Sequence, residues 1–184
     1  NSTNMQDRRR IQLYSNRSTA HPDDLVTIEV YCTVNRALLD NIMADCVFLH
    51  GALNVRVIVL LQESAKMTFK SFSFSILASV LRMLLRVQRL GICVAFVPYK
   101  PLGVCKAGNT ESLCTQLVKM MLFTPLRIIE FDGVVVPTSD LALLPELAEV
   151  VVYDANFDIE SLKLPDRVTI RKASKLLSFA PSQN

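Results

Sequence analysis

Three arginines at helical spacing carry the clearest sign of binding chemistry in this sequence. Arg82, Arg86 and Arg89 lie at positions i, i+4 and i+7. On a helix they share one face, where their guanidinium groups could meet phosphates or an acidic protein surface together. A second basic run, Arg8-Arg9-Arg10, lies in a polar leader. For the first group the spacing favours a solvated outer helix face, with a contact for an anionic partner as the alternative, and the second run is a further candidate for such a contact.

Charge is distributed unevenly along the chain. No Asp or Glu occurs between Glu63 and Glu111, whereas residues 130–160 carry acidic side chains and no Lys or Arg. A basic tail then begins at Lys163. The formal net charge is only +3, but such a division makes a molecule electrically polar, which orients a partner and raises association rates.

Residue constellations for catalysis or metal binding are lacking in the sequence. His21 and His50 do not form a pair at metal or catalytic spacing, and there is no GxSxG elbow. The segment 103–108 has two of the five glycines but lacks the GxxxxGK[ST] order of a phosphate-binding loop. We therefore expect no catalytic residue, no metal ion and no cofactor.

One short segment resembles a catalytic motif. Residues 128–134 read Ile-Ile-Glu-Phe-Asp-Gly-Val, which is similar to the DxDG motif of haloacid dehalogenases, whose first Asp is the nucleophile. Glu130 stands at that place and carries its carboxylate one methylene further out. Asp132-Gly133 is better interpreted as a turn, and the chain as a protein that is not an enzyme.

The cysteines and the apolar segments indicate a compartment. Five cysteines lie mostly within apolar segments and form no CxxC pair, which is typical of buried thiols in a reducing, intracellular environment, cytoplasmic or organellar, the mitochondrion included. The longest apolar stretch, 75–85, is interrupted by Arg82 and is far shorter than the roughly 20 residues that cross a bilayer. We expect no membrane insertion.

Hydrophobic periodicity predicts one α/β domain over residues 25–180, after a flexible basic arm at 1–24 and before a short tail at 181–184. Strand and helix candidates alternate in the first part of the domain, which implies parallel strands with crossover helices. The strand candidates are 26–31, 55–61, 91–97, 127–136, 150–153 and 167–170, and the helix candidates are 34–49, 72–90 and 111–122.

A repeat of about 20 residues emerges in the second half. The pattern Leu126-x-x-Ile129-x-Phe131 returns 21 residues later as Leu147-x-x-Val150-x-Val152, and a weaker Val168-x-Ile170 follows 18 residues after that. A fixed period near 20 with an LxxLxL core resembles the leucine-rich repeat. The segment 144–156 matches best, although its Asn156 comes one place late. Upstream, the longer spacings between Val30, Val57, Ile92 and Phe131 are similar to repeats of the ribonuclease-inhibitor kind.

This resemblance implies an α/β leucine-rich-repeat-like solenoid with a parallel sheet of about six strands and helices on one side. Neighbouring repeats must stack to bury their apolar stripes, which leaves the strand face open. The leading hypothesis is a non-enzymatic interaction or scaffold subunit that binds other protein subunits through that face. The face would carry Glu29, Arg56, Glu130, Glu149 and Thr169.

Two alternatives stay open. In the first, the chain is a ribonucleoprotein subunit whose basic arm at 8–10 and arginine stripe at 82–89 contact RNA phosphates. In the second, the element order over residues 25–98 resembles the STAS domain of anti-sigma-factor antagonists. The acceptor serine of that family would fall at Ser71 or Ser73, where phosphorylation would act as a switch, although Lys70 replaces the Asp that normally precedes it.

Overall fold

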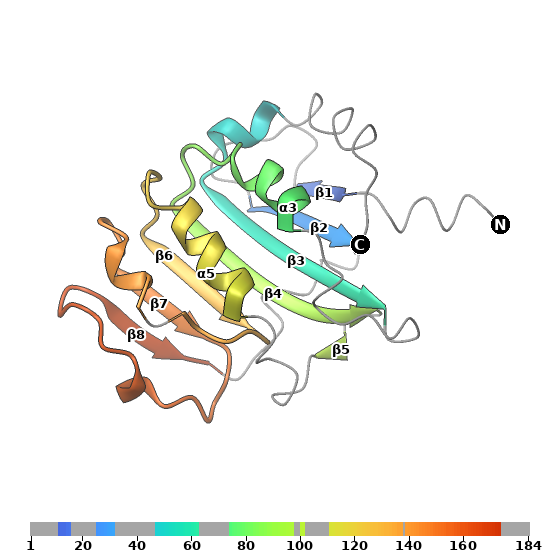
Figure 1. Cartoon of the computed structure of the whole chain (residues 1–184). Coiled ribbons are helices and arrows are strands. Elements are labelled where there is room, and N and C mark those ends of the chain that lie inside the picture. Colours follow the sequence, from blue (N-terminus) through green and yellow to red (C-terminus); the bar gives the residue numbers. More distant parts are fainter. Residues whose placement is uncertain are drawn as a thin grey trace.

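The fold is a parallel sheet whose strands follow one another in chain order. The computed structural model describes residues 11–15, 25–31, 47–62, 74–97, 100–101, 111–137 and 139–173, and Figure 1 shows the open sheet that they form. Six strands run parallel in the order β2-β3-β4-β6-β7-β8. They are β2 (Leu25–Tyr31), β3 (Asn54–Gln62), β4 (Arg89–Val97), β6 (Ile128–Asp132), β7 (Glu149–Val152) and β8 (Thr169–Lys172). The predicted α/β class with about six parallel strands is confirmed.

Two further strands pair antiparallel with this sheet. β1 (Ile11–Ser15) pairs with β2, and β5 (Lys100–Pro101) pairs with β4. β1 lies within the segment 1–24 that the sequence predicts as a flexible arm, so that prediction is wrong for residues 11–15. Ile11 and Leu13 alternate with Gln12 and Tyr14, which is the pattern of a short strand.

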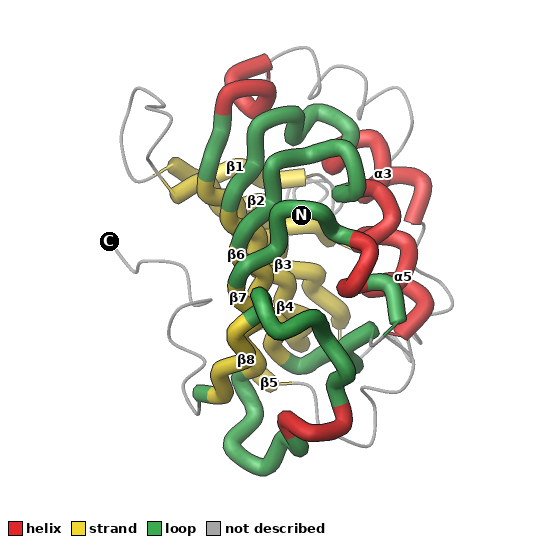
Figure 2. Tube along the Cα trace, turned by 90° about the vertical axis from the view of Figure 1, so that its left-hand side faces the viewer, coloured by secondary structure: helices red, strands yellow, loops and turns green. Residues whose placement is uncertain are grey.

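Two α-helices, α3 (Phe74–Leu81) and α5 (Glu111–Met120), lie on one side of the sheet (Figure 2). Short 3₁₀ helices lie directly before β3 and in the connections before β7 and β8: η1 (Val47–Gly51), η5 (Leu141–Leu143) and η6 (Ile159–Ser161). The second half therefore has the irregular connections that its short strand spacing predicts. Of the helix expected at 34–49, residues 34–46 lie outside the described part of the chain, and 47–49 belong to η1.

The helix expected at 72–90 is much shorter in the structure, because α3 ends at Leu81. Apolar residues continue at intervals of three: Leu81, Leu84, Val87 and Leu90 are all buried. A spacing of three fits one helix face, but it equally fits a series of tight turns with i to i+3 bonds. Here the Leu84 N–H donates to the Leu81 carbonyl at 3.0 Å, and the chain then enters β4.

The buried stripes align across the sheet and form the core. Val57 lies beside Ile92, Ile92 beside Phe131, and Phe131 beside Val152, and all four side chains are buried. The register confirms the 21-residue spacing between β6 and β7. At the ends of the sheet two alignments differ from the sequence prediction: Ile28 rather than Val30 pairs with Val57, and Ile170 rather than Val168 pairs with Val150.

The same backbone hydrogen-bond arrangement joins successive units just before β4, β6 and β7. One carbonyl oxygen of a unit accepts hydrogen bonds from two consecutive N–H groups of the next unit, which fixes the register at the strand start. The carbonyls are those of Leu53 (from Gln88 and Arg89, 2.8 and 3.0 Å), Gln88 (from Arg127 and Ile128, 2.8 and 3.0 Å) and Arg127 (from Ala148 and Glu149, 2.7 and 3.0 Å).

Several strand ends differ from those predicted, and the difference is greatest at β6. β6 was expected to continue to Val136 but ends at Asp132, because Gly133 adopts a φ of 68°. That backbone region favours glycine and turns the chain, so the turn expected at Asp132-Gly133 is confirmed. β8 begins at Thr169, two residues later than expected.

Candidate functional site

The sheet face opposite the core carries a row of charged residues that is interrupted by Gly91 and by the buried Val151. In register across the sheet lie Arg56 of β3, Gly91 of β4, Glu130 of β6, Val151 of β7 and Arg171 of β8. Alternate residues of a strand point to opposite faces, so the apolar stripe on one face places this row on the other. Because Gly91 has no side chain, a gap opens between Arg56 and Glu130.

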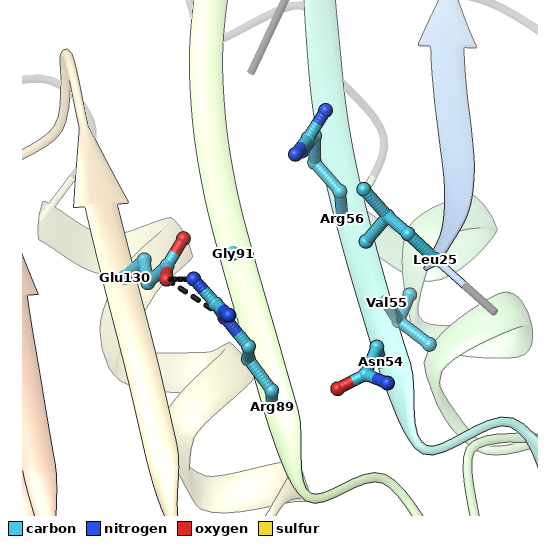
Figure 3. A pocket seen from close by; sticks show the side chains of 7 residues that line it. All are labelled: Leu25, Asn54, Val55, Arg56, Arg89, Gly91 and Glu130. Carbon is cyan, nitrogen blue, oxygen red and sulfur yellow. Dashed lines mark hydrogen bonds and ion pairs between the residues drawn. The ribbon is translucent and has the colours of Figure 1, made fainter. Parts of the chain in front are cut away.

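The gap forms a recess of about 270 Å³. Figure 3 shows Arg56 and Glu130 on the strands to either side of Gly91, with Arg89 extending along β4 toward Glu130. Two guanidinium groups and one carboxylate therefore surround it, so the side chains in the recess carry a net positive charge. The recess is lined by Leu25, Asn54, Val55, Arg56, Arg89, Gly91 and Glu130.

An ion pair fixes the β6 side of this recess. Arg89 Nε donates to Glu130 Oε1 at 2.8 Å, and Arg89 Nη2 contacts the same oxygen. The Glu130 residue is only 4% exposed, while the Arg89 side chain is 47% exposed. The Tyr153 hydroxyl lies 3.5 Å from Glu130 Oε2, and the Tyr153 N–H donates to the Phe131 carbonyl at 2.9 Å. A buried carboxylate needs such partners.

Arg56 forms the other wall. Burial lowers the pKa of the Arg56 guanidinium below its ordinary value, and the nearby Glu130 carboxylate partly offsets this effect. The group remains charged at neutral pH, since an arginine is effectively always protonated in proteins. A partly desolvated cation interacts more strongly with an incoming anion than one in bulk water.

The next row along the strands holds a buried acid and a buried thiol. Asp132 lies beside Cys93, and both are buried. Among the described residues, Asp132 Oδ2 has no hydrogen-bond partner, and burial raises the pKa of this carboxyl to about 7. Burial, and then the neighbouring Asp132, raise the pKa of the Cys93 thiol, against a smaller opposing effect of Arg56. A neutral buried thiol is a poor nucleophile, so this pair does not form an activated catalytic group.

The five residues predicted for the strand face share that face by register. Arg56 and Glu130 line the recess, while Glu149 and Thr169 are paired at the starts of β7 and β8. Glu149 accepts from Arg171 Nε at 3.1 Å. For Glu29 only the backbone is described, beside Ile58. The face is not uniformly open, because Glu130 is buried and its carboxylate is bound by Arg89.

The arginine stripe is arranged differently from the prediction. Arg82 and Arg86 are exposed in the turns after α3, and Arg89 begins β4. The three do not share a helix face, because the helix ends at Leu81. The basic arm at Arg8, Arg9 and Arg10 lies outside the described residues.

Sequence reasoning missed the partners that complete the recess: Asn54, Gly91 and Tyr153, and the pairing of Arg89 with Glu130. One signal was present. A glycine inside an otherwise apolar strand often marks a site where another group approaches the backbone closely, and Gly91 is such a glycine. The pairing of Arg89 depends on strand neighbours far apart in sequence and had no local signal.

Comparisons with protein-family models, with curated proteins and with solved structures gave no match for this chain. Among the residues that the structure describes, no group of three or more His, Cys, Asp or Glu side chains is placed to hold a metal ion. Over the same ranges, every helix is too short or too polar to cross a membrane.

The Arg89–Glu130 pair should contribute more to stability than the exposed Arg171–Glu149 pair. Arg89→Met leaves a buried carboxylate without its cation, which we expect to lower the free energy of unfolding by about 2 kcal/mol or more. Arg171→Met, the matched control, should change it by less than about 1 kcal/mol. Urea denaturation of both variants measures the difference. Equal losses would show that Glu130 does not depend on Arg89.

Asp132 should make folding stability depend on pH. Its pKa is about 7 in the folded protein and near its ordinary value of 3.8 in the unfolded chain, so between these values the folded state binds more protons. Stability then falls as pH rises from about 4 to about 7, by at most about 1.4 kcal/mol per pH unit for this group. Unfolding free energies of wild type and Asp132→Asn across this window test it. Parallel pH profiles for the two proteins would contradict the assignment.

Proposed function

We propose that this chain is a non-enzymatic interaction subunit that docks a protein partner on its strand face and receives an acidic side chain of that partner in the recess above Gly91. The observation that carries this proposal is the in-register row Arg56–Gly91–Glu130. A gap between a guanidinium and a paired carboxylate is a specific place for a second carboxylate.

Charge and size both support an acidic side chain. The recess is lined by two guanidinium groups, Arg56 and Arg89, and by one carboxylate, Glu130, so its charged side chains favour an incoming anion. Guanidinium groups bind carboxylates through two parallel N–H donors. A recess of about 270 Å³ is close to the lower end of the roughly 300–1,000 Å³ typical of small-molecule pockets. It suits one side chain of a docked chain better than a free cofactor.

The arrangement of the units supports a leucine-rich-repeat-like solenoid as the scaffold. Parallel strands in chain order, a repeated apolar stripe and the same carbonyl junction before successive strands are expected of stacked repeats. In such proteins the strand face is the surface that usually meets a partner. We further propose that the protein works in a reducing compartment, which is supported by Cys93 and Cys114, two free and buried thiols.

A protein segment with both acidic and basic side chains fits the surroundings of the recess better than RNA does. The strands on its far side lead into an acidic stretch, with Glu146, Asp154, Asp158 and Glu160 in the connections around β7 and η6. A nucleic-acid backbone that extended from the recess across these connections would be repelled. A protein segment can meet both regions with side chains of matching charge.

Affinity purification of the full chain with quantitative mass spectrometry tests the proposal. We expect proteins retained by wild type, after nuclease treatment, to be reduced about tenfold with Arg56→Gln, because a charge-assisted contact is worth more than about 1.4 kcal/mol. Lys163→Gln, an exposed cation in the loop before β8, is the control and should retain them. Release by nuclease would favour the ribonucleoprotein alternative, and full retention by Arg56→Gln would refute the role of the recess.

A further inference from the structure

All four large hydrophobic side chains that are exposed in the described residues occupy equivalent places. They are Phe48, Leu85, Phe123 and Leu143, and their exposure ranges from 39% for Phe48 to 97% for Phe123. Each lies in the turn that leads into one of four neighbouring strands, β3, β4, β6 and β7. In each case the exposed residue comes four to six residues before the first paired residue of the strand. These first residues are Asn54, Arg89, Ile128 and Glu149, which lie side by side in the sheet.

These turns form one edge of the molecule. Neighbouring strands lie about 4.8 Å apart, and Figure 1 shows the turns before β3, β4, β6 and β7 following one another along the edge where the strands begin. We call Phe48, Leu85, Phe123 and Leu143 the apolar edge. Exposed hydrophobic residues scattered singly need no explanation, but one in each of four consecutive turns is a pattern.

The fold itself does not require these side chains. In three of the turns the adjacent residue is the one that enters the core: Leu49 beside Phe48, Leu84 beside Leu85, and Leu144 beside Leu143 are buried. A polar residue at the outward position would serve folding equally well and would be better solvated. Contiguous exposed hydrophobic residues rimmed by polar ones mark interaction sites.

Arginines accompany the apolar edge in two of its four turns. Arg82, Arg86 and Arg127 are exposed there, and no described residue forms an ion pair with their side chains. The turns 47–53, 82–88 and 121–127 contain no Asp or Glu. The fourth turn differs, since Asp140 and Glu146 flank Leu143.

We propose that the apolar edge, with Arg82, Arg86 and Arg127, is a second docking surface that binds an acidic amphipathic helix of a partner protein. Four strand positions span about 14 Å, which is the length of about ten helical residues. The apolar stripe of such a helix recurs every three to four residues and meets the edge residues in turn. Glutamates beside the stripe pair with the arginines.

The acidic residues around Leu143 favour an amphipathic helix over RNA or an anionic membrane as the partner of the apolar edge. RNA offers little apolar surface to Phe123 and would be repelled by Asp140 and Glu146. An anionic membrane surface would accept the phenylalanines and arginines but would be repelled by the same two carboxylates. A helix can place a basic residue at the end that meets this turn.

The apolar edge goes beyond the proposed function, because it is separate from the recess and can be tested without it. The probe is a fluorescein-labelled synthetic peptide of about 15 residues with Leu at i, i+3, i+4 and i+7, Glu elsewhere and Lys at one end. A peptide of the same composition with scrambled order is its control. Fluorescence anisotropy with the full chain measures binding.

We expect the striped peptide to bind the wild-type chain. Its dissociation constant should rise about tenfold with Phe123→Ser, and also with the double change Arg82→Glu and Arg86→Glu. Each of these changes removes about 1.4 kcal/mol or more of binding free energy. Lys163→Glu and Arg56→Gln should leave it unchanged. Phe123→Ser should melt at the wild-type temperature, since this side chain is 97% exposed. Leu85→Ser provides a second apolar variant with the same expected loss of affinity.

Three results would overturn the assignment. One is equal binding of the striped and scrambled peptides. Another is an unchanged dissociation constant in Phe123→Ser and Leu85→Ser. The third is a protein that does not bind the peptide but does bind another anionic partner, either vesicles of phosphatidylcholine and phosphatidylserine or a single-stranded RNA oligonucleotide. In this case the same variants would lose that binding. Failure of the Arg56 experiment has no bearing on these outcomes.

Discussion

Each unit of this chain carries an apolar stripe that it cannot bury alone, and the mutual burial of these stripes is the constraint on which the rest of the structure depends. Val57, Ile92, Phe131 and Val152 lie side by side from four strands and are all buried. The stripes meet only if the strands are parallel and in this register, because a shift of one residue would turn every side chain to the opposite face.

The same constraint positions the polar groups. Fixing the apolar stripe on one face places Arg56, Gly91 and Glu130 in one row on the other, so the recess is a consequence of the register. Arg89 precedes Gly91 by two residues and so lies on the same face, within reach of Glu130. Three of the turns before the strands obey a related rule: one side chain is directed into the core, and the residue beside it is exposed and belongs to the apolar edge.

Local pattern in the sequence was sufficient for some parts of this fold. The six parallel strands were predicted from their β-branched runs, and the spacing between Phe131 and Val152 indicated the register of β6 and β7. Arg56 and Glu130 were identified as strand-face residues because each alternates with apolar neighbours. The α5 helix begins at Glu111, as its periodicity predicts.

Other parts depend on information that the local pattern does not contain. The interval of three from Leu81 to Leu90 fits both a helix and a series of tight turns, so Arg82, Arg86 and Arg89 were placed on one helix face. The pairing of Arg89 with Glu130 and the buried state of Asp132 depend on neighbours that are distant in sequence. At the sheet ends, where stripes are weaker, the register of Ile28 and Ile170 differed from the pattern-based alignment.

Methyl and aromatic nuclear Overhauser effects between adjacent stripes test the stacking most directly. With labelled Val, Ile and Phe side chains, the in-register order predicts cross-peaks from Val57 to Ile92, from Ile92 to Phe131 and from Phe131 to Val152, with none directly from Val57 to Phe131. Cross-peaks that join Val57 to Phe131, or that link Ile92 to Val152 without Phe131 between them, would contradict the chain-order stack.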